Sequence, residues 1–330
     1  MNFSTLPKIE LHCHLDGSLR VKTVLDIAEK ENIELPTYNI KQLEEELKAP
    51  LECTSLVEYL NRFNIPIKIM QSRDSLKRVA YELMEDAAKD GVKYIEIRYA
   101  PVLHTEKGLT VEEVIESVLE GVKQGEKDFN IYGNLILSCL RHRGPQSAEI
   151  VIEAGKKYLG RGVVAVDLCG AENEGFAEPF VDCIAKARKS GYRITIHAGE
   201  TGFGTNVIDA VELLGAERIG HGVAIKDMQE AYDLVKKKGI ILEMCPTSNV
   251  QTKAANSYED HPIMEFFRDG VKVSFNTDNR TVSGTTVTDE CNYMNKSKSI
   301  TMDEYRKIYM DSVEASFASE EVKDKLRSLI

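Results

Sequence analysis

The sequence contains no uninterrupted apolar run that approaches the roughly 20 residues of a membrane-spanning helix. Residues 1–8 also lack the basic segment followed by an apolar segment that marks a secretory signal peptide. Positive charge is scarce, because 42 Lys and Arg residues stand against 53 Asp and Glu residues, a net charge of −11. We therefore expect a protein that binds neither nucleic acid nor membrane.

Several chemical motifs are absent as well. The seven cysteines have no CxxC spacing, and their odd number in a chain of this size predicts reduced, mostly buried thiols in a cytoplasmic protein. No GxGxxG follows the first predicted strand, so a dinucleotide-binding fold has no support. HExxH and the paired HxE and PCxxC motifs of cytidine-type deaminases are missing too.

What the sequence does contain is a regular alternation of short apolar segments and amphipathic segments. The predicted strands are one that begins near Ile9 and ends in His12 and His14, followed by Val92–Arg98, Tyr132–Leu140, Val163–Leu168, Arg193–His197, Arg218–His221, Ile240–Met244 and Val271–Asn276. Strands that alternate with helices form parallel sheets. Eight such units in 330 residues predict a (β/α)₈ TIM barrel, with residues 1–330 as a single domain. An open doubly wound sheet is the alternative.

Two additions to the plain barrel are expected. A helical insertion after strand 1, over residues 33–72, contains helices predicted at Gln42–Leu47 and Ser55–Phe63, and insertions of this kind often form lids. Extra C-terminal helices are predicted at Thr288–Asn295, Met302–Phe317 and Glu320–Ile330.

Histidines occupy the ends of the predicted strands. His12 and His14 end the first strand on one face, and His197 and His221 end the fifth and sixth. Asp278 follows the last strand. In a (β/α)₈ barrel the strand ends form one functional rim, so we expect these side chains to meet there.

The residue types at this rim suit a catalytic metal. His12, His14, His197 and Asp278 provide nitrogen and carboxylate ligands for one zinc ion, although iron and manganese accept the same ligand types. Glu200 and His221 are then free to transfer protons.

Taken singly, each of these residues has a plainer interpretation. One histidine is more often a hydrogen-bonded core residue than a ligand, Asp278 suits a turn or helix cap, and Glu200 suits a solvated surface. The shared rim is what favours a site. His104, His142 and His261 lie in predicted loops, and we assign them no role.

Five segments of the chain, read together, resemble the adenosine deaminase family. They are PKIELHCHLDGS at 7–18, HAGE at 197–200, RIGHG at 218–222, CPTSN at 245–249 and NTD at 276–278. Their order and spacing hold from the first strand to the last, so the resemblance covers nearly the whole chain.

The resemblance implies hydrolytic deamination of adenosine, and of 2′-deoxyadenosine, to inosine and ammonia in purine salvage, with one zinc per subunit. His12, His14, His197 and Asp278 match the family's zinc ligands. Glu200 matches the proton donor to purine N1, and His221 matches the residue that orients or deprotonates the zinc-bound water. The matching substrate contacts are Gly170 to purine N3, Asp16 to the ribose 5′-hydroxyl, Phe63 in the lid over the base, and His14 beside the substrate.

One position departs from the family pattern. Many members have a second Asp where this chain has Asn279, facing purine N7. An Asn amide can donate a hydrogen bond to N7 directly, whereas an Asp must first be protonated. The change is compatible with purine binding.

Two alternative functions stay open at this stage. A related deaminase could act on adenine or on an adenine nucleotide, and Arg62, Lys68 and Arg73 near the insertion are candidates for a phosphate contact. A binding protein that kept the barrel but lost the chemistry would show a damaged ligand set, and this set is intact. The sequence gives no oligomeric state, and a monomer is compatible with it.

Overall fold

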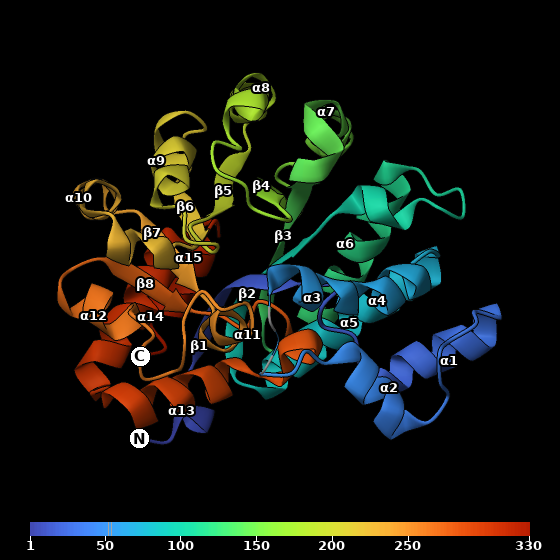
Figure 1. The fold of residues 1–330 in the computed structure, drawn as a ribbon. Coiled ribbons are helices and arrows are strands. Elements are labelled where there is room, and N and C mark those ends of the chain that lie inside the picture. The colour runs from blue at the N-terminus through green and yellow to red at the C-terminus, as the bar shows by residue number, and fades with distance from the viewer. Residues whose placement is uncertain (52, 54) are drawn as a thin grey trace.

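Eight parallel strands form the centre of the protein, and the computed structural model describes residues 1–51, 53 and 55–330 (Figure 1). The strands are β1 (Lys8–His14), β2 (Val92–Tyr99), β3 (Tyr132–Leu140), β4 (Val163–Cys169), β5 (Arg193–Ala198), β6 (Arg218–His221), β7 (Ile241–Met244) and β8 (Lys272–Phe275). Each pairs in parallel with the next along the chain, in the order β1 to β8. All eight predicted strands are present. The last is shorter than predicted at both ends, since Val271 and Asn276 lie outside it.

The sheet closes between β8 and β1, at Asp278. The His14 N–H donates to the Asp278 carbonyl oxygen at 2.7 Å, and the Asp278 N–H donates to the His12 carbonyl oxygen at 3.0 Å. This closure confirms the (β/α)₈ barrel over the open sheet. It also fixes Asp278 against His12 and His14 through the backbone alone.

Helices follow the strands, as the alternating pattern predicted. The helices that alternate with the strands are α1 (Val21–Glu31), α5 (Arg73–Lys89), α6 (Val111–Asp128), α7 (Gly144–Gly155), α8 (Val181–Ser190), α9 (Gly204–Glu212), α10 (Gln229–Lys238) and α12 (Ile263–Arg268). A short helix, α11 (Pro246–Gln251), starts directly after β7 where none was expected. Among the described residues, no helix has the length and apolar character that crossing a membrane requires.

Both predicted additions are present. The insertion contains α2 (Ile40–Leu47), α3 (Leu56–Leu60) and α4 (Asn64–Ile69), and a 3₁₀ turn at Asn61–Phe63 joins the last two. The predicted insertion also spans positions 52 and 54, which lie outside the described residues. The C-terminal helices are α13 (Val287–Lys298), α14 (Met302–Ala315) and α15 (Glu320–Arg327).

The barrel interior contains a buried group of charges below the rim. Arg98 and Arg218 donate to the two carboxylate oxygens of Glu243 at 2.6 and 2.7 Å, and Arg218 also pairs with Glu96. All four side chains are almost completely buried. Buried charges are costly unless they are paired and hydrogen-bonded, and these are both. The network holds Glu243 rigidly under the rim.

Candidate active site

Five ionisable side chains converge at the carboxyl ends of the strands. One ligand atom from each of His12, His197, His221 and Asp278 lies within 4.8 Å of the others, and all four residues are buried. His14 belongs to the same group, because its Nε2 lies 3.3 Å from Asp278 Oδ1 and 3.2 Å from His197 Nε2. The rim predicted from the sequence is therefore present, and its arrangement follows from the strand ends and the β8–β1 closure.

Carboxylates fix the proton positions on two of these histidines. His12 Nδ1 lies 3.0 Å from Glu243 Oε2, and His197 Nδ1 lies 2.9 Å from Asp167 Oδ1. A carboxylate only accepts hydrogen bonds, so each Nδ1 carries the proton and each Nε2 presents a lone pair. His12 Nε2 is buried and has no hydrogen-bond partner.

These lone pairs provide a test of whether the group fits a metal. His12, His14 and His197 direct ring nitrogens at a small buried space that Asp278 also faces. Lone pairs that converge in this way repel one another unless a cation lies among them. Three imidazoles and one carboxylate are also a suitable ligand set for a divalent transition metal. The residues fit such an ion.

The carboxylate behind His197 leads to a first prediction. Asp167→Asn is expected to weaken metal binding by about 10- to 100-fold, because the neutral amide no longer orients and polarises the imidazole. Competition with a chromogenic chelator measures this affinity, and the exposed Asp227→Asn serves as the control. An unchanged affinity would show that Asp167 does not support a ligand.

Glu200 lies on a tightly held turn after β5. Glu172, which follows β4, accepts hydrogen bonds from the backbone N–H groups of Gly199, Glu200 and Thr201 at 2.7, 2.9 and 2.9 Å. The Glu172 carboxylate also accepts from the Thr201 hydroxyl and the Asn206 amide, at 3.0 and 2.9 Å. One buried carboxylate thus fixes the backbone that carries Glu200.

Burial makes Glu200 a weak acid. Its pKa is raised to about 8, first by burial and then by the negative charges of Asp278 and Glu172. The Glu200 carboxylate lies 3.7 Å from His221 Nε2. Glu200 is therefore protonated at neutral pH and able to donate a proton into the cavity.

A cavity of about 350 Å³ lies above the metal-binding group. All the predicted site residues except His12 line it; they are His14, Asp16, Phe63, Gly170, His197, Glu200, His221, Asp278 and Asn279. His12 lies below its floor and is completely buried. The structure brings the predicted residues together, while their individual roles remain predictions. His142 also lines the cavity, although we assigned it no role from its position in a predicted loop.

Asn279 is held by the insertion. Its Nδ2 donates to the Tyr59 hydroxyl at 2.8 Å, and that hydroxyl lies 2.6 Å from Ser283 Oγ. Any side chain in place of Gly17 would collide with the Asn279 amide, since a Cβ there would lie 1.8 Å from Oδ1. Tyr59 thus links α3 of the insertion to the floor of the cavity.

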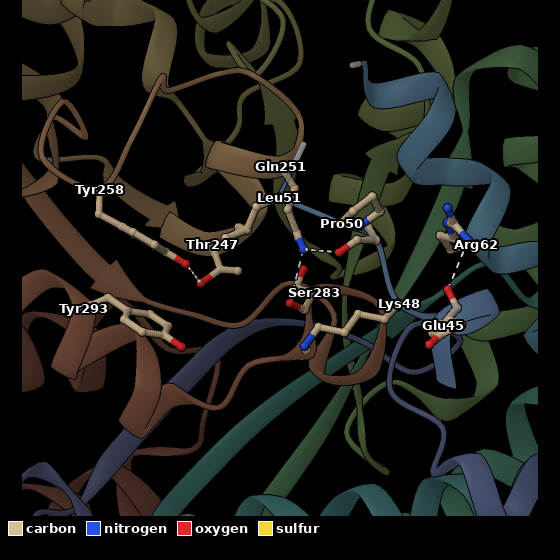
Figure 2. Close-up of a pocket in the computed structure, with 12 residues that line it drawn as sticks. Glu45, Lys48, Pro50, Leu51, Arg62, Thr247, Gln251, Tyr258, Ser283 and Tyr293 are labelled. Atoms are coloured by element: carbon tan, nitrogen blue, oxygen red, sulfur yellow. Dashed lines mark hydrogen bonds between the residues drawn. The ribbon is translucent and has the colours of Figure 1, made fainter. Parts of the chain in front are cut away.

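A second cavity, of about 360 Å³, separates the insertion from the loops after β7 and β8 (Figure 2). Gln251 lies beside it and donates to the carbonyl oxygens of Ala49 and Ser283, at 2.8 and 3.2 Å. Arg62 donates to the Glu45 carbonyl oxygen in the same view. The Gln251–Ala49 bond joins α11 to the insertion, whereas the Arg62–Glu45 bond lies within the insertion. None of the metal-binding side chains lines this cavity.

Several supporting residues were missed by the sequence analysis. They are three buried carboxylates on different strands or the loops that follow them. Glu172 holds the backbone of Glu200, Asp167 contacts His197, and Glu243 contacts His12. Each follows or lies in a strand of the barrel, so the strand-end position was an available signal for Asp167 and Glu172. Nothing in the sequence indicated which histidine each carboxylate would face.

Known proteins resemble this chain along its whole length. The family model described as adenosine deaminase matches residues 7–330. An adenosine deaminase of Clostridium perfringens is 57% identical over 99% of this chain and 98% of its own length. An adenosine deaminase of Clostridium botulinum is also 57% identical, over all of this chain and 98% of its own.

Solved structures share the fold at lower identity. An adenine deaminase of Arthrobacter aurescens has a TM-score of 0.90 at 28% identity and covers 98% of both chains. An amidohydrolase of Burkholderia ambifaria with bound zinc has a TM-score of 0.90 at 25% identity, over 99% of this chain and 90% of its own. An N6-methyl-AMP deaminase of Arabidopsis thaliana has a TM-score of 0.86 at 27% identity, over 99% and 96%.

Proposed function

The chain belongs to the adenosine deaminase family, and from this premise we propose how the residues of its barrel rim carry out the reaction. The enzyme hydrolyses adenosine to inosine and ammonia. The observation that carries the proposal is the meeting, in one cavity, of a buried metal-binding group and a buried carboxyl group, Glu200, whose pKa is raised by that burial.

One zinc ion per chain is the proposed cofactor, held by His12, His14, His197 and Asp278. The converging lone pairs and the carboxylates behind two of the histidines support this assignment. A relative of similar fold contains zinc. When bound, zinc lowers the pKa of a coordinated water to about 7 and thereby supplies a nucleophile at neutral pH.

Glu200 and His221 are the proposed catalytic residues. Protonated Glu200 donates to purine N1, which makes C6 more electrophilic as the ring loses aromaticity. His221 and Asp278 hold the attacking water in position. Because Glu200 and His221 come from the adjacent strands β5 and β6, both groups approach the base from the same part of the rim.

The remaining cavity residues are proposed to hold the nucleoside. Gly170 donates its backbone N–H to purine N3, Asn279 faces N7, and Phe63 covers the base from the insertion. Asp16 accepts from the ribose 5′-hydroxyl. Its carboxyl is buried with one unpartnered oxygen and has a pKa raised to about 7, with burial the main cause.

A nucleoside suits this cavity better than a nucleotide. Among the described residues that line it there is no Lys or Arg to bind a phosphate. The candidates near the insertion are engaged elsewhere: Arg62 donates to the Glu45 and Glu46 carbonyl oxygens, Lys68 to the Glu34 carbonyl oxygen, and Arg73 to Glu113. The buried carboxyl of Asp16 would also oppose a 5′-phosphate.

Substrate comparison tests this assignment. We expect kcat/KM to be highest for adenosine and 2′-deoxyadenosine, and lower by about 10²-fold or more for AMP and adenine. Adenine lacks the ribose that Asp16 would bind, and the phosphate of AMP would be repelled by the Asp16 carboxyl. The ultraviolet absorbance change on deamination measures all four rates. Comparable rates for AMP would overturn the nucleoside assignment.

The pH dependence of the reaction tests the protonated state of Glu200. Only the protonated form of Glu200 can donate a proton, and with a pKa raised to about 8 this form predominates below that pH. Above it, kcat/KM is expected to fall by about tenfold per pH unit, as one essential proton is lost. Burial is the largest cause of the shift. A decline that begins near pH 5 would contradict this role.

A further inference from the structure

His221 differs from its neighbouring histidines in what lies behind its ring. Glu243 and Asp167 accept from the Nδ1 atoms of His12 and His197, so those rings carry their proton on Nδ1. His221 Nδ1 instead lies 3.0 Å from Nδ2 of Asn249, on α11. An amide nitrogen only donates, so His221 Nδ1 must present a lone pair, and the ring proton must lie on Nε2.

Two backbone donors fix the orientation of the Asn249 amide. The Cys245 N–H donates to Asn249 Oδ1 at 3.4 Å, which identifies that atom as the oxygen. The Ile263 N–H donates to His261 Nδ1 at 3.3 Å, so the His261 proton lies on Nε2 and is donated to Asn249 Oδ1 at 3.1 Å. A flipped amide would set donors against donors at both contacts.

The chain of contacts from Ile263 to His221 is buried. Asn249 and His261 are completely buried, and His221 is 1% exposed. Burial also lowers the pKa of His261 to about 3, so its ring stays neutral and keeps a single proton. These groups are therefore shielded from bulk solvent, and each proton position determines the next.

We propose that Asn249 and His261 are positioning residues that fix the proton of His221 on Nε2, which makes His221 a hydrogen-bond donor in the reaction rather than a further metal ligand. This inference rests on the proposed function, since it concerns the role of His221 in that site. His12 and His197 offer a lone pair to the metal because carboxylates lie behind them. His221 cannot do so, because an amide donor lies behind it.

The proposal predicts that replacing the amide nitrogen of Asn249 with an oxygen reverses the role of His221. Asn249→Asp keeps the side-chain shape and still accepts from Cys245 and His261. It also turns the group behind His221 into an acceptor, so the ring proton moves to Nδ1 and the Nε2 lone pair faces the metal. We expect turnover of adenosine to fall by about 10²-fold or more, while zinc binds about tenfold more tightly or better.

The opposite directions of the two effects separate this role from simple damage. Turnover and zinc affinity, by chelator competition, are measured on the wild type, on Asn249→Asp and on Asn256→Asp, an exposed control with the same charge change. The control should match the wild type. An unchanged turnover, or a zinc affinity that is unchanged or weaker in Asn249→Asp, overturns the proposal.

A spectroscopic measurement keeps the test independent of the variant's folding. Nitrogen chemical shifts of the histidine rings report the tautomer of each ring in the wild-type protein, with and without zinc, and His221→Gln identifies the His221 signals. We expect Nδ1 without a proton and Nε2 with one in both states; a proton on Nδ1 overturns the proposal. Failure of the proposed function would appear separately, as wild-type protein that does not deaminate adenosine.

Discussion

Glu200→Gln is expected to lower the turnover of adenosine by about 10²- to 10⁴-fold, the usual contribution of a positioned general acid. Glutamine has nearly the shape of the protonated acid that burial favours at this position, so the turn held by Glu172 should survive. The amide cannot give up a proton to N1. Glu200 is not among the proposed zinc ligands, so zinc content should stay at the wild-type level.

Steady-state rates and metal analysis on the same preparations check this expectation. Glu174→Gln makes the same chemical change at an exposed position two residues from Glu172 and should leave the rate unchanged. If Glu200→Gln retained wild-type turnover, the proton donor would have to be another group. A loss of zinc with turnover would instead indicate that Glu200 supports the metal.

Asp278→Asn is expected to have an effect of similar size through the metal. Asp278 has a positive φ of 60°, a conformation that Asn adopts readily, so the backbone closure between β8 and β1 should remain. The Ser248 hydroxyl, which donates to Asp278 Oδ2 at 2.6 Å, can still donate to an amide oxygen. The negative charge among His12 and His14 is lost.

Zinc affinity should therefore fall sharply, and turnover should fall by about 10³-fold or more, since a metal supplies several kcal/mol of transition-state stabilisation. Chelator competition and initial rates measure the two effects. The exposed Asp260→Asn is the matched control. Near-normal turnover with a full complement of zinc in Asp278→Asn would remove Asp278 from the site.

The strands and the rim could be predicted because they depend on local patterns. Apolar runs of four to nine residues, separated by amphipathic helices, are enough to indicate parallel strands. Barrel geometry then places every strand's carboxyl end on one rim. His197 and His221 could be grouped with His12 for this reason, although about 185 residues or more separate them in the chain.

Which group each supporting residue contacts could not be predicted, because these contacts depend on side-chain directions across the barrel. Glu243 reaches His12 from β7, and Arg98 reaches Glu243 from β2. No spacing in the sequence encodes such contacts. The same holds for His261, which lies in a loop as predicted but contacts Asn249, a role that no sequence pattern indicated.

One short helix that tertiary contacts stabilise was not predicted. Helix α11 begins at Pro246, directly after β7, and its Gln251 bonds to the insertion. A helix of six residues has too little periodicity to be recognised from sequence. Its position nevertheless matters, because α11 carries both Ser248 and Asn249 to the rim.

The zinc dependence of adenosine turnover is the most direct test of the whole account. The protein is stripped of metal with a chelator, its residual metal is measured by mass spectrometry, and zinc is returned in steps while adenosine turnover is followed. The account predicts no turnover without metal and a linear recovery that reaches its plateau at one zinc per chain. Metal-free protein with full activity would contradict it.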